Sequence, residues 1–376
     1  MSSILFEPVD IKSIQLKNRF VRSATIEGLA TFDGQPTQKL KELYFRLAKG
    51  EVGLVVTSAA LVEAYKNLPN IEGLPFPSAI DEDRYVEDWI EVIDGVHERG
   101  SKIAMQIQHP GRQDYPSLRG SAPIAPSAVP LEDKDIIPRE MTIDEIEEMV
   151  DKFAQACRRV KEAGFDAVQL HGAHGYLINN FISPYANVRT DRYGGNTENR
   201  SRFIVEIVKK ARKFVGPEYP LMIKMNFDDF IDRGLDKDEA VRVAKIIVKG
   251  GIDCIEVSGG TQAEGGKHIS VKGINKEKKE AYFRSYAKAL KEHVSIPVIL
   301  VGGLRTPSVM EKLVEDGVAD LVSICRPFIR EPQLIKRWKD GDLTKAKCIS
   351  CNKCLENWIK RPTRCYVEEP MEGGKE

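Results

Sequence analysis

The stretch HGAHGY begins at His171 and directly follows the apolar run AVQL. Imidazole N–H groups can stabilise a developing oxyanion, and a phenol can donate a proton. In a continuing strand His171 and His174 would point to opposite faces, because side chains alternate. Gly172 and Gly175 let the backbone leave extended geometry, so both imidazoles and Tyr176 could converge. The alternative interpretation is that these are polar side chains in a solvated loop.

Eight short apolar runs alternate with longer segments of helical period and predict strands. They are NRFVRSA from Asn18, VGLVVTS from Val52, KIAMQIQ from Lys102, AVQLH from Ala167, LMIKMN from Leu221, CIEVSG from Cys254, PVILVGG from Pro297 and LVSIC from Leu321. Nearly continuous apolar strands suit a parallel sheet buried on both faces, and eight such units predict an α/β fold, the (β/α)8 TIM barrel. A doubly wound sheet is the alternative, but it would gather the glycines and histidines at a single switch point.

The segment between the third and fourth strands has the clearest helical pattern. Thr142 and Glu145 predict a capping box at its start, and Gly164 predicts its end. Its apolar residues fall on one face: Ile146, Met149, Val150, Phe153, Cys157 and Val160. At the N-terminus, ILFEPVDIKSIQLKN alternates like a hairpin that would close the bottom of the barrel. We predict a barrel domain over residues 1–340 and a short cysteine-rich extension over residues 341–376.

Polar and small residues follow several other strands, at the end where such barrels carry their active sites. Gln106 lies near the end of the third strand. Gly302 and Gly303 end the seventh strand, and Cys325 and Arg326 end the eighth. Loops at these last two positions are the usual phosphate site of the fold, because small residues let backbone N–H groups approach an anion and an arginine adds donors.

Two long connections are expected on the same side of the barrel. Residues 109–141 hold six prolines, and the segment that follows the sixth strand, GGTQAEGGKHISVKGINKEKK, is rich in glycine and lysine. Such loops usually cover a site, although a solvated excursion explains the second one equally well. The segment RTDRYGGNTENR predicts a turn followed by a helix cap.

Charge and hydropathy exclude several classes of partner. The 376 residues include 56 basic and 56 acidic side chains, so the formal net charge is zero. The chain therefore lacks the excess of positive charge that binding to nucleic acid or to an anionic membrane usually needs. The longest apolar run, IPVILV, is far too short to span a bilayer, and the first ten residues show no signal-peptide pattern. We therefore expect a cytoplasmic protein.

Four of the seven cysteines crowd together near the C-terminus: Cys348, Cys351, Cys354 and Cys365. Their spacing is CxxCxxCx10C, and such crowding in a reducing compartment indicates metal chemistry rather than disulfides. Four thiolates satisfy a [4Fe-4S] cluster or a structural zinc ion. Metal-free thiols are the third possibility.

The motifs LKNRFV, QIQHPGR, GFDAVQLHGAHGYLINNFISPYANVRTDRYGGNTENRSRF, VGG and ADLVSICRPFIREP together resemble the Old Yellow Enzyme family of FMN-dependent NAD(P)H:flavin oxidoreductases. The resemblance runs from about Leu5 to Arg337 and is closest to the branch of 2,4-dienoyl-CoA reductase and 2-enoate reductase. That branch binds a [4Fe-4S] cluster at a similar place, with one more residue in both later cysteine gaps. We expect no C-terminal FAD/NAD domain of the kind that its larger members carry.

The resemblance implies FMN across the barrel mouth, with its phosphate near Gly302, Gly303, Cys325 and Arg326. It also implies that Ala24 and Ala59 line the flavin ring, and that Gln106 and Lys224 meet the pyrimidine edge, where a cation stabilises the negative charge of reduced flavin. His171 and His174 would donate hydrogen bonds to a substrate oxygen, and Tyr176 would donate the proton.

Three positions depart from the family pattern. Ile26 stands where relatives carry a side chain that tunes the flavin, which leaves the neighbouring Thr25 as the candidate donor. Lys224 replaces a common arginine and loses its planar fork of donors. Cys325 replaces a common glycine, so any phosphate contact there must come from its backbone N–H.

The expected activity is hydride transfer from NAD(P)H through FMN to an activated C=C bond of an enone, enal or enoyl substrate. An amine dehydrogenase or demethylase on the same barrel and an electron-transfer subunit with an iron–sulphur cluster are the alternatives. We also expect a small-molecule substrate, an external electron donor and a homo-oligomer.

Overall fold

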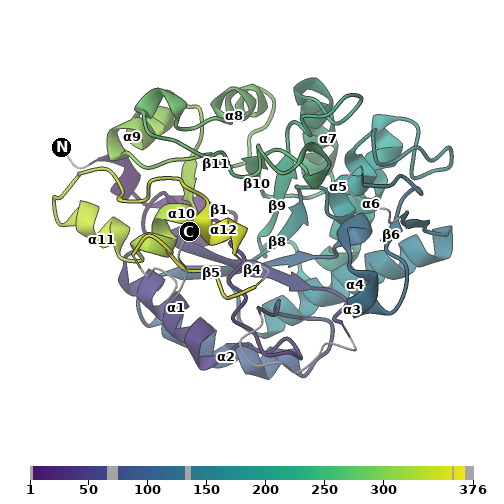
Figure 1. Cartoon of the computed structure of the whole chain (residues 1–376), viewed down its shortest axis with the longest axis horizontal. Helices are drawn as coiled ribbons and strands as arrows, with labels where there is room; N and C mark the ends of the chain where they lie inside the picture. The colour runs from purple at the N-terminus through teal and green to yellow at the C-terminus, as the bar shows by residue number, and fades with distance from the viewer. Residues whose placement is uncertain (1–2, 66–74, 132–136, 358–359, 369–376) are drawn as a thin grey trace, which may run out of the picture.

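Eight parallel strands close into a barrel in the computed structural model, which describes residues 3–65, 75–131, 137–357 and 360–368 (Figure 1). The barrel strands are β3 (Phe20–Arg22), β4 (Leu54–Leu61), β5 (Lys102–Gln108), β8 (Ala167–Gly172), β9 (Leu221–Asn226), β10 (Cys254–Ser258), β11 (Val298–Val301) and β12 (Leu321–Ile324). They pair in chain order, and β12 returns to β3. Each of the eight predicted runs supplies one strand, so the (β/α)8 prediction is confirmed and the doubly wound alternative is wrong.

Helices surround the barrel on the outside (Figure 1). The long ones are α1 (Gln38–Lys49), α2 (Tyr85–His97), α4 (Ile143–Glu162), α6 (Thr197–Val215), α7 (Lys237–Lys249), α8 (Arg284–Lys291) and α9 (Pro307–Glu315). Shorter helices are α3 (Pro116–Arg119), α5 (Leu177–Ile182), α10 (Arg326–Arg330), α11 (Leu334–Lys339) and α12 (Lys353–Glu356). Helix α4 carries the predicted capping box between Thr142 and Glu145 and buries all six predicted apolar residues.

A two-stranded hairpin closes the bottom of the barrel, as predicted. It consists of β1 (Val9–Ile11) and β2 (Ile14–Leu16). Ile11 and Leu16 are fully buried in one cluster with apolar residues from the first halves of the barrel strands, including Leu54 and Leu321. These side chains fill the lower lumen, and active sites of this fold lie at the opposite end, where the strands have their C-terminal residues.

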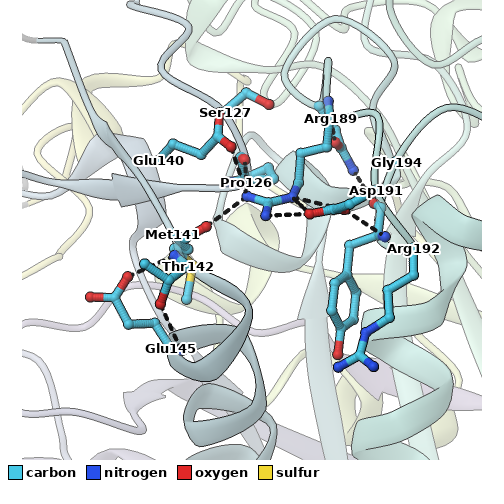
Figure 2. Close-up of polar contacts among 12 residues, drawn as sticks. Pro126, Ser127, Glu140, Met141, Thr142, Glu145, Arg189, Asp191, Arg192 and Gly194 are labelled. Carbon is cyan, nitrogen blue, oxygen red and sulfur yellow. Dashed lines mark hydrogen bonds and ion pairs between the residues drawn. The ribbon is translucent and has the colours of Figure 1, made fainter.

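The long connection between β5 and α4 contains two short paired strands that the sequence did not indicate, β6 (Ile124–Ala125) and β7 (Arg139–Glu140). Arg189 holds this connection from outside (Figure 2). Its Nη1 donates to the carbonyls of Pro126 and Met141, at 2.8 and 2.7 Å, and its Nη2 lies 2.6 Å from Asp191 Oδ2. The motif RTDRYGGNTENR is therefore a clasp for the loop. It is also the predicted helix cap, because the side chain of Asn196 accepts from Asn199 N at the start of α6.

The described part of the C-terminal segment lies against the barrel and contains only α12 as regular structure. Backbone hydrogen bonds attach it at three points: Ala346 N donates to Arg305 O and Thr363 N to Glu27 O, both at 2.8 Å, and Gly273 N donates to Ser350 O at 3.0 Å. The division of the chain at residue 340 stays a prediction. None of the helices in the described ranges combines the length and the apolar character that crossing a bilayer requires.

We expect Arg189→Ala to lower the free energy of unfolding by about 2–4 kcal/mol, because it leaves two buried carbonyls and a carboxylate without their donor. Arg192→Ala is the matched control. Arg192 lies three residues away and pairs with Glu147 on the surface, where both side chains are about half exposed, so its loss is expected to cost less than about 1 kcal/mol. Urea denaturation of both variants measures the difference. Equal losses would contradict the clasp.

Candidate active site

The HGAHGY stretch brings its three polar rings together at the end of β8. The ring centroids of His171 and His174 are 5.2 Å apart, and those of His171 and Tyr176 are 4.7 Å apart. His171 is 6% exposed, and its Nδ1 has no hydrogen-bond partner among the described residues. The predicted convergence is therefore confirmed, and the solvated-loop interpretation is wrong.

The backbone turns sharply here to make that convergence possible. His174 has a φ of +63°, in the left-handed region, and Gly175 follows at +81°. Asn side chains hold the turn: His174 N donates to Asn226 Oδ1 at 3.2 Å, and Gly175 N donates to Asn179 Oδ1 at 2.7 Å. Turning both residues out of extended geometry places His174 on the same side as His171.

Both long connections reach this turn, as predicted. Gln113 Nε2, from the first connection, donates to His174 O at 2.7 Å. Thr261, from the second, forms a parallel bridge with His174. The start of the second connection therefore belongs to the site, while most of its later residues are exposed or partly exposed.

Burial determines the protonation of the three rings. It lowers the pKa of His171 to about 3, with a further contribution from the Lys224 charge. Burial also lowers the pKa of His174, assisted by His171 and Lys224. The pKa of Tyr176 rises to about 12, first through burial and then through the neighbouring Tyr115. At neutral pH the site therefore presents two neutral imidazoles and a protonated phenol.

A polar network fills the barrel lumen below these rings. The carboxylate of Glu256 is fully buried. Its Oε1 accepts from Ser23 Oγ at 2.7 Å and Ser323 Oγ at 2.9 Å, and lies 3.2 Å from Lys224 Nζ. Burial alone would raise the pKa of Glu256, but the Lys224 charge and the hydroxyl donors outweigh it, so this pKa is lowered. The cation of Lys224 is thus offset by a carboxylate that the sequence analysis missed.

Gln106 joins the same network through a second residue that the sequence analysis missed. Gln106 Nε2 donates to Gln169 Oε1 at 2.7 Å, and Gln169 Nε2 donates to Glu256 Oε2 at 3.0 Å. Strand register explains the chain of contacts, because Gln106 pairs with Gln169 and Lys224 pairs with Glu256 on adjacent strands. Ser258, two residues after Glu256 and on the same face, lies 2.8 Å from His174 Nε2. A period-two count of polar residues along these strands was the signal that could have found all three.

The structure also brings together several residues expected around a flavin. Ala59 lies beside Gln106 across the β4–β5 pair, where the register shifts. Thr25 Oγ1 donates to Ser23 O at 2.9 Å and lies 3.1 Å from Cys325 Sγ, so the hydroxyl and the thiol hold each other. Ala24, between Ser23 and Thr25, is partly exposed.

The two glycines after β11 adopt conformations that other residues rarely take. Gly302 and Gly303 have φ values of +141° and +70°. A Cβ on Gly303 would approach Ile274 and Tyr282 to 3.1 Å. The backbone conformation and the neighbouring Ile274 and Tyr282 therefore require glycine here, and the contact of these glycines with a phosphate stays a prediction.

Arg326 takes a different orientation from the one expected of a phosphate ligand. Its Nη1 donates to Val271 O at 2.9 Å and to Asn352 Oδ1. The guanidinium therefore faces the C-terminal segment in this structure, and its contact with phosphate stays a prediction.

The four tail cysteines line one small pocket of about 20 Å³, together with Arg326 and Asn352. Burial raises the pKa of the Cys348 thiol, and it raises that of Cys354 to about 12, with a contribution from Cys325. Within the described ranges, no three His, Cys, Asp or Glu side chains approach closely enough to hold a metal ion. The structure therefore describes a cysteine-lined pocket but no metal site.

The buried histidines generate a prediction for stability against pH. Their folded pKa values lie below the unfolded value of about 6.5, so the unfolded chain binds more protons between those values. Stability is then fully present above about pH 6.5 and is lost as the pH falls. We expect His171→Asn to reduce this slope by up to about 1.4 kcal/mol per pH unit between pH 6 and 4. Unfolding titrations at several pH values measure it. An unchanged slope in His171→Asn would contradict the prediction.

Comparison with known proteins places this geometry in a family. The family model described as "NADH:flavin oxidoreductase / NADH oxidase family" matches residues 4–344. The chain is 38% identical over 352 residues to an NADH oxidase of Thermoanaerobacter brockii, covering 93% of this chain and 52% of that protein. It is 34% identical to an NADPH dehydrogenase of Bacillus subtilis (strain 168), covering 88% and 93% of the two chains.

A solved structure agrees over a similar extent. The 2-naphthoyl-CoA reductase complex with 2-naphthoyl-CoA superposes with a TM-score of 0.88 at 27% identity, covering 97% of this chain and 56% of that one. The chain thus spans about half the length of this protein and of the NADH oxidase. The agreement of family model, relatives and barrel shows that the chain belongs to the NADH:flavin oxidoreductase / NADH oxidase family.

Proposed function

We propose that the chain is an FMN-dependent oxidoreductase that passes hydride from NAD(P)H to an activated C=C bond. The observation that carries the proposal is the group of two neutral imidazoles and one protonated phenol at the C-terminal ends of the barrel strands. Reduction of an electron-poor alkene needs donors for the oxygen that gains charge and an acid for the α-carbon. His171 and His174 are the donors, and Tyr176 is the acid.

The residues around the mouth fit FMN. His171 Nδ1 is buried and has no hydrogen-bond partner among the described residues. This nitrogen can therefore donate a hydrogen bond to a bound group, or accept one from it. Gln106 and Lys224 would hold the pyrimidine edge, Ala24, Thr25 and Ala59 would line the ring, and Gly302, Gly303, Cys325 and Arg326 would surround the phosphate. Bound FMN supplies the acceptor and donor of hydride. Because Lys224 is paired with Glu256, the barrel would offer the cofactor a neutral ion pair rather than a bare cation.

The substrate class that we propose is an enone, enal or enoyl thioester, as in the 2,4-dienoyl-CoA reductase and 2-enoate reductase branch. A relative that was solved with 2-naphthoyl-CoA supports an acyl thioester as a member of the test panel. The test is bleaching of the flavin absorbance by NADH or NADPH under anaerobic conditions, followed by recolouring with cyclohexenone, cinnamaldehyde or an enoyl-CoA. Bleaching by an amine instead would favour the dehydrogenase alternative, and no turnover with any substrate would favour an electron-transfer subunit.

Tyr176→Phe is expected to separate the two halves of the reaction. Reduction by NAD(P)H needs no acid, so that rate should stay near the wild-type value, whereas reoxidation by enone should fall by about 10² to 10⁴. His171→Ala and His174→Ala should instead weaken phenol binding and slow enone reduction by roughly 10² to 10³, because each removes one donor. Stopped-flow absorbance measures both halves. Equal slowing of the halves in Tyr176→Phe would remove the acid role.

We propose further that the tail cysteines bind one four-iron cluster. One pocket is lined by Cys348, Cys351, Cys354 and Cys365. The loop that contains the first three cysteines has a strained backbone, because Ser350 and Asn352 adopt left-handed φ values. A single zinc ion needs four thiolates about 2.3 Å from one point. Ligands of a cluster bind four separate irons, so the proposal requires the four thiols to surround one pocket rather than one point.

We expect anaerobically purified protein to contain about four irons per chain, assembled by these cysteines. Cys351→Ser should lose most of the iron and the cluster absorbance. Cys157→Ser is the control, because Cys157 is buried in the core face of α4 and should leave the iron content unchanged. Zinc at one per chain without iron would turn the tail into a structural site, and neither metal would leave four ordinary thiols.

A further inference from the structure

The turn at the end of β8 is supported by a buried carboxylate that lies outside the group of three rings. Asp229 follows β9 and is completely buried. Its Oδ1 accepts from the side-chain amides of Asn226, at 2.9 Å, and Asn179, at 3.3 Å. Its Oδ2 accepts from Leu235 N at 3.0 Å, and the Ser183 side chain forms a further hydrogen bond with the carboxylate. This one carboxylate therefore joins α5, the end of β9 and the loop that follows β9.

Among the described residues, only neutral groups donate to the Asp229 carboxylate, and burying a carboxylate in this way lowers the stability of a fold. Burial raises the pKa of Asp229, and the hydrogen bond from Asn226 is the largest of the contributions that oppose this shift. An asparagine would fill nearly the same volume without a charge, but it would place an NH2 group where Asp229 has a second acceptor. The position therefore favours a group that accepts hydrogen bonds at both of its terminal atoms.

The two amides connect this carboxylate to the turn. Asn226 Oδ1 accepts from His174 N at 3.2 Å, and Asn179 Oδ1 accepts from Gly175 N at 2.7 Å. A backbone N–H can only donate, so each amide oxygen must face the turn and each NH2 group must face away from it. The Asp229 carboxylate accepts from both NH2 groups. It therefore opposes the flipped orientation of either amide, in which two acceptors would face each other.

The turn needs this support because its backbone is strained. His174 has a φ of +63° and Gly175 a φ of +81°, and a residue other than glycine keeps a left-handed conformation only when its surroundings hold it there. This conformation brings the His174 ring to 5.2 Å from the ring of His171, between centroids, and its Nε2 to 2.8 Å from Ser258 Oγ. Rotation of either amide would release the turn and displace the imidazole.

We infer that Asp229 is a positioning residue: its carboxylate fixes the orientation of the Asn226 and Asn179 amides and thereby holds the His174 imidazole in place. The expected effect on catalysis rests on the proposed function, in which this imidazole donates to the substrate oxygen, whereas the expected effect on the turn does not. The competing explanation is that Asp229 only closes its own loop, because Asp229 N also donates to Leu235 O at 2.8 Å.

The first test compares Asp229→Asn with Asp228→Asn. Asp228 is the adjacent carboxylate, but it accepts from Tyr286 Oη at 2.9 Å and from Phe230 N at 2.7 Å rather than from the two amides. We expect hydrogen exchange of the two turn amides to become at least about tenfold faster in Asp229→Asn and to keep the wild-type rate in Asp228→Asn. NMR measures both rates without turnover. Wild-type exchange of the turn amides in Asp229→Asn would overturn the inference.

The second test is a double-mutant cycle on flavin-loaded protein, with reoxidation by cyclohexenone followed by stopped-flow absorbance. Asp229→Asn alone should slow this step by about 10- to 100-fold, the cost of a misplaced group. His174→Ala already removes the positioned donor, so adding Asp229→Asn to it should cost less than about threefold. A residue that only closes its loop would cost the same in both backgrounds. Additive losses would therefore remove the positioning role.

Asn226→Ala provides the measurement if Asp229→Asn does not fold. It cuts the link to His174 N and leaves the contacts between Asp229 and Leu235 in place. Exchange should become faster at the His174 amide and stay unchanged at the Leu235 amide, and the opposite pattern would contradict the inference.

The two kinds of test also fail separately. Faster exchange of the turn amides in a protein that reduces no alkene would remove the proposed function and keep the positioning role. Unchanged exchange in an Asp229→Asn variant of an active alkene reductase would do the reverse.

Discussion

The buried carboxylate of Glu256 is the constraint around which the barrel is arranged. An ion in the centre of a protein costs several kcal/mol unless it is paired and hydrogen-bonded. Glu256 meets that requirement with Ser23 of the segment after β3, Gln169 of β8, Lys224 of β9 and Ser323 of β12. Four separate parts of the barrel must therefore be in register before the charge is satisfied, and the same register aligns the residues under the mouth.

The same side chains therefore contribute both to the stability of the fold and to the electrostatics of the site. Lys224 cannot turn freely toward a ligand, because its ammonium also serves Ser23 and Glu256. Gln106 is held by Gln169 in the same way. The side chains that would face a cofactor are thus positioned before it binds, which is the condition for electrostatic stabilisation without reorganisation.

The fold was predictable because its signals are local: apolar runs for all eight strands, a capping box for α4 and an alternating hairpin for the base. The convergence of the His171, His174 and Tyr176 rings was predictable because the three residues lie within six positions of one another. Gln169, Glu256 and Ser258 were not singled out, since each is one polar residue in an apolar strand and acquires meaning only through the register of its neighbours. The orientation of Arg326 toward Asn352 and the clasp made by Arg189 depend on contacts between distant segments, which periodicity does not show.

The left-handed backbone at His174 limits how this position can change through evolution. A φ of +63° is tolerated by glycine, asparagine, aspartate and histidine, and it is strained in β-branched or bulky residues. Of the tolerated side chains, glycine has no donor and aspartate only accepts when ionised, so asparagine is the one exchange that keeps both the turn and the side-chain N–H that we propose for the substrate oxygen. Homologous lineages should therefore drift between two residues here, while His171, which is buried in an ordinary strand, is limited by its chemistry alone.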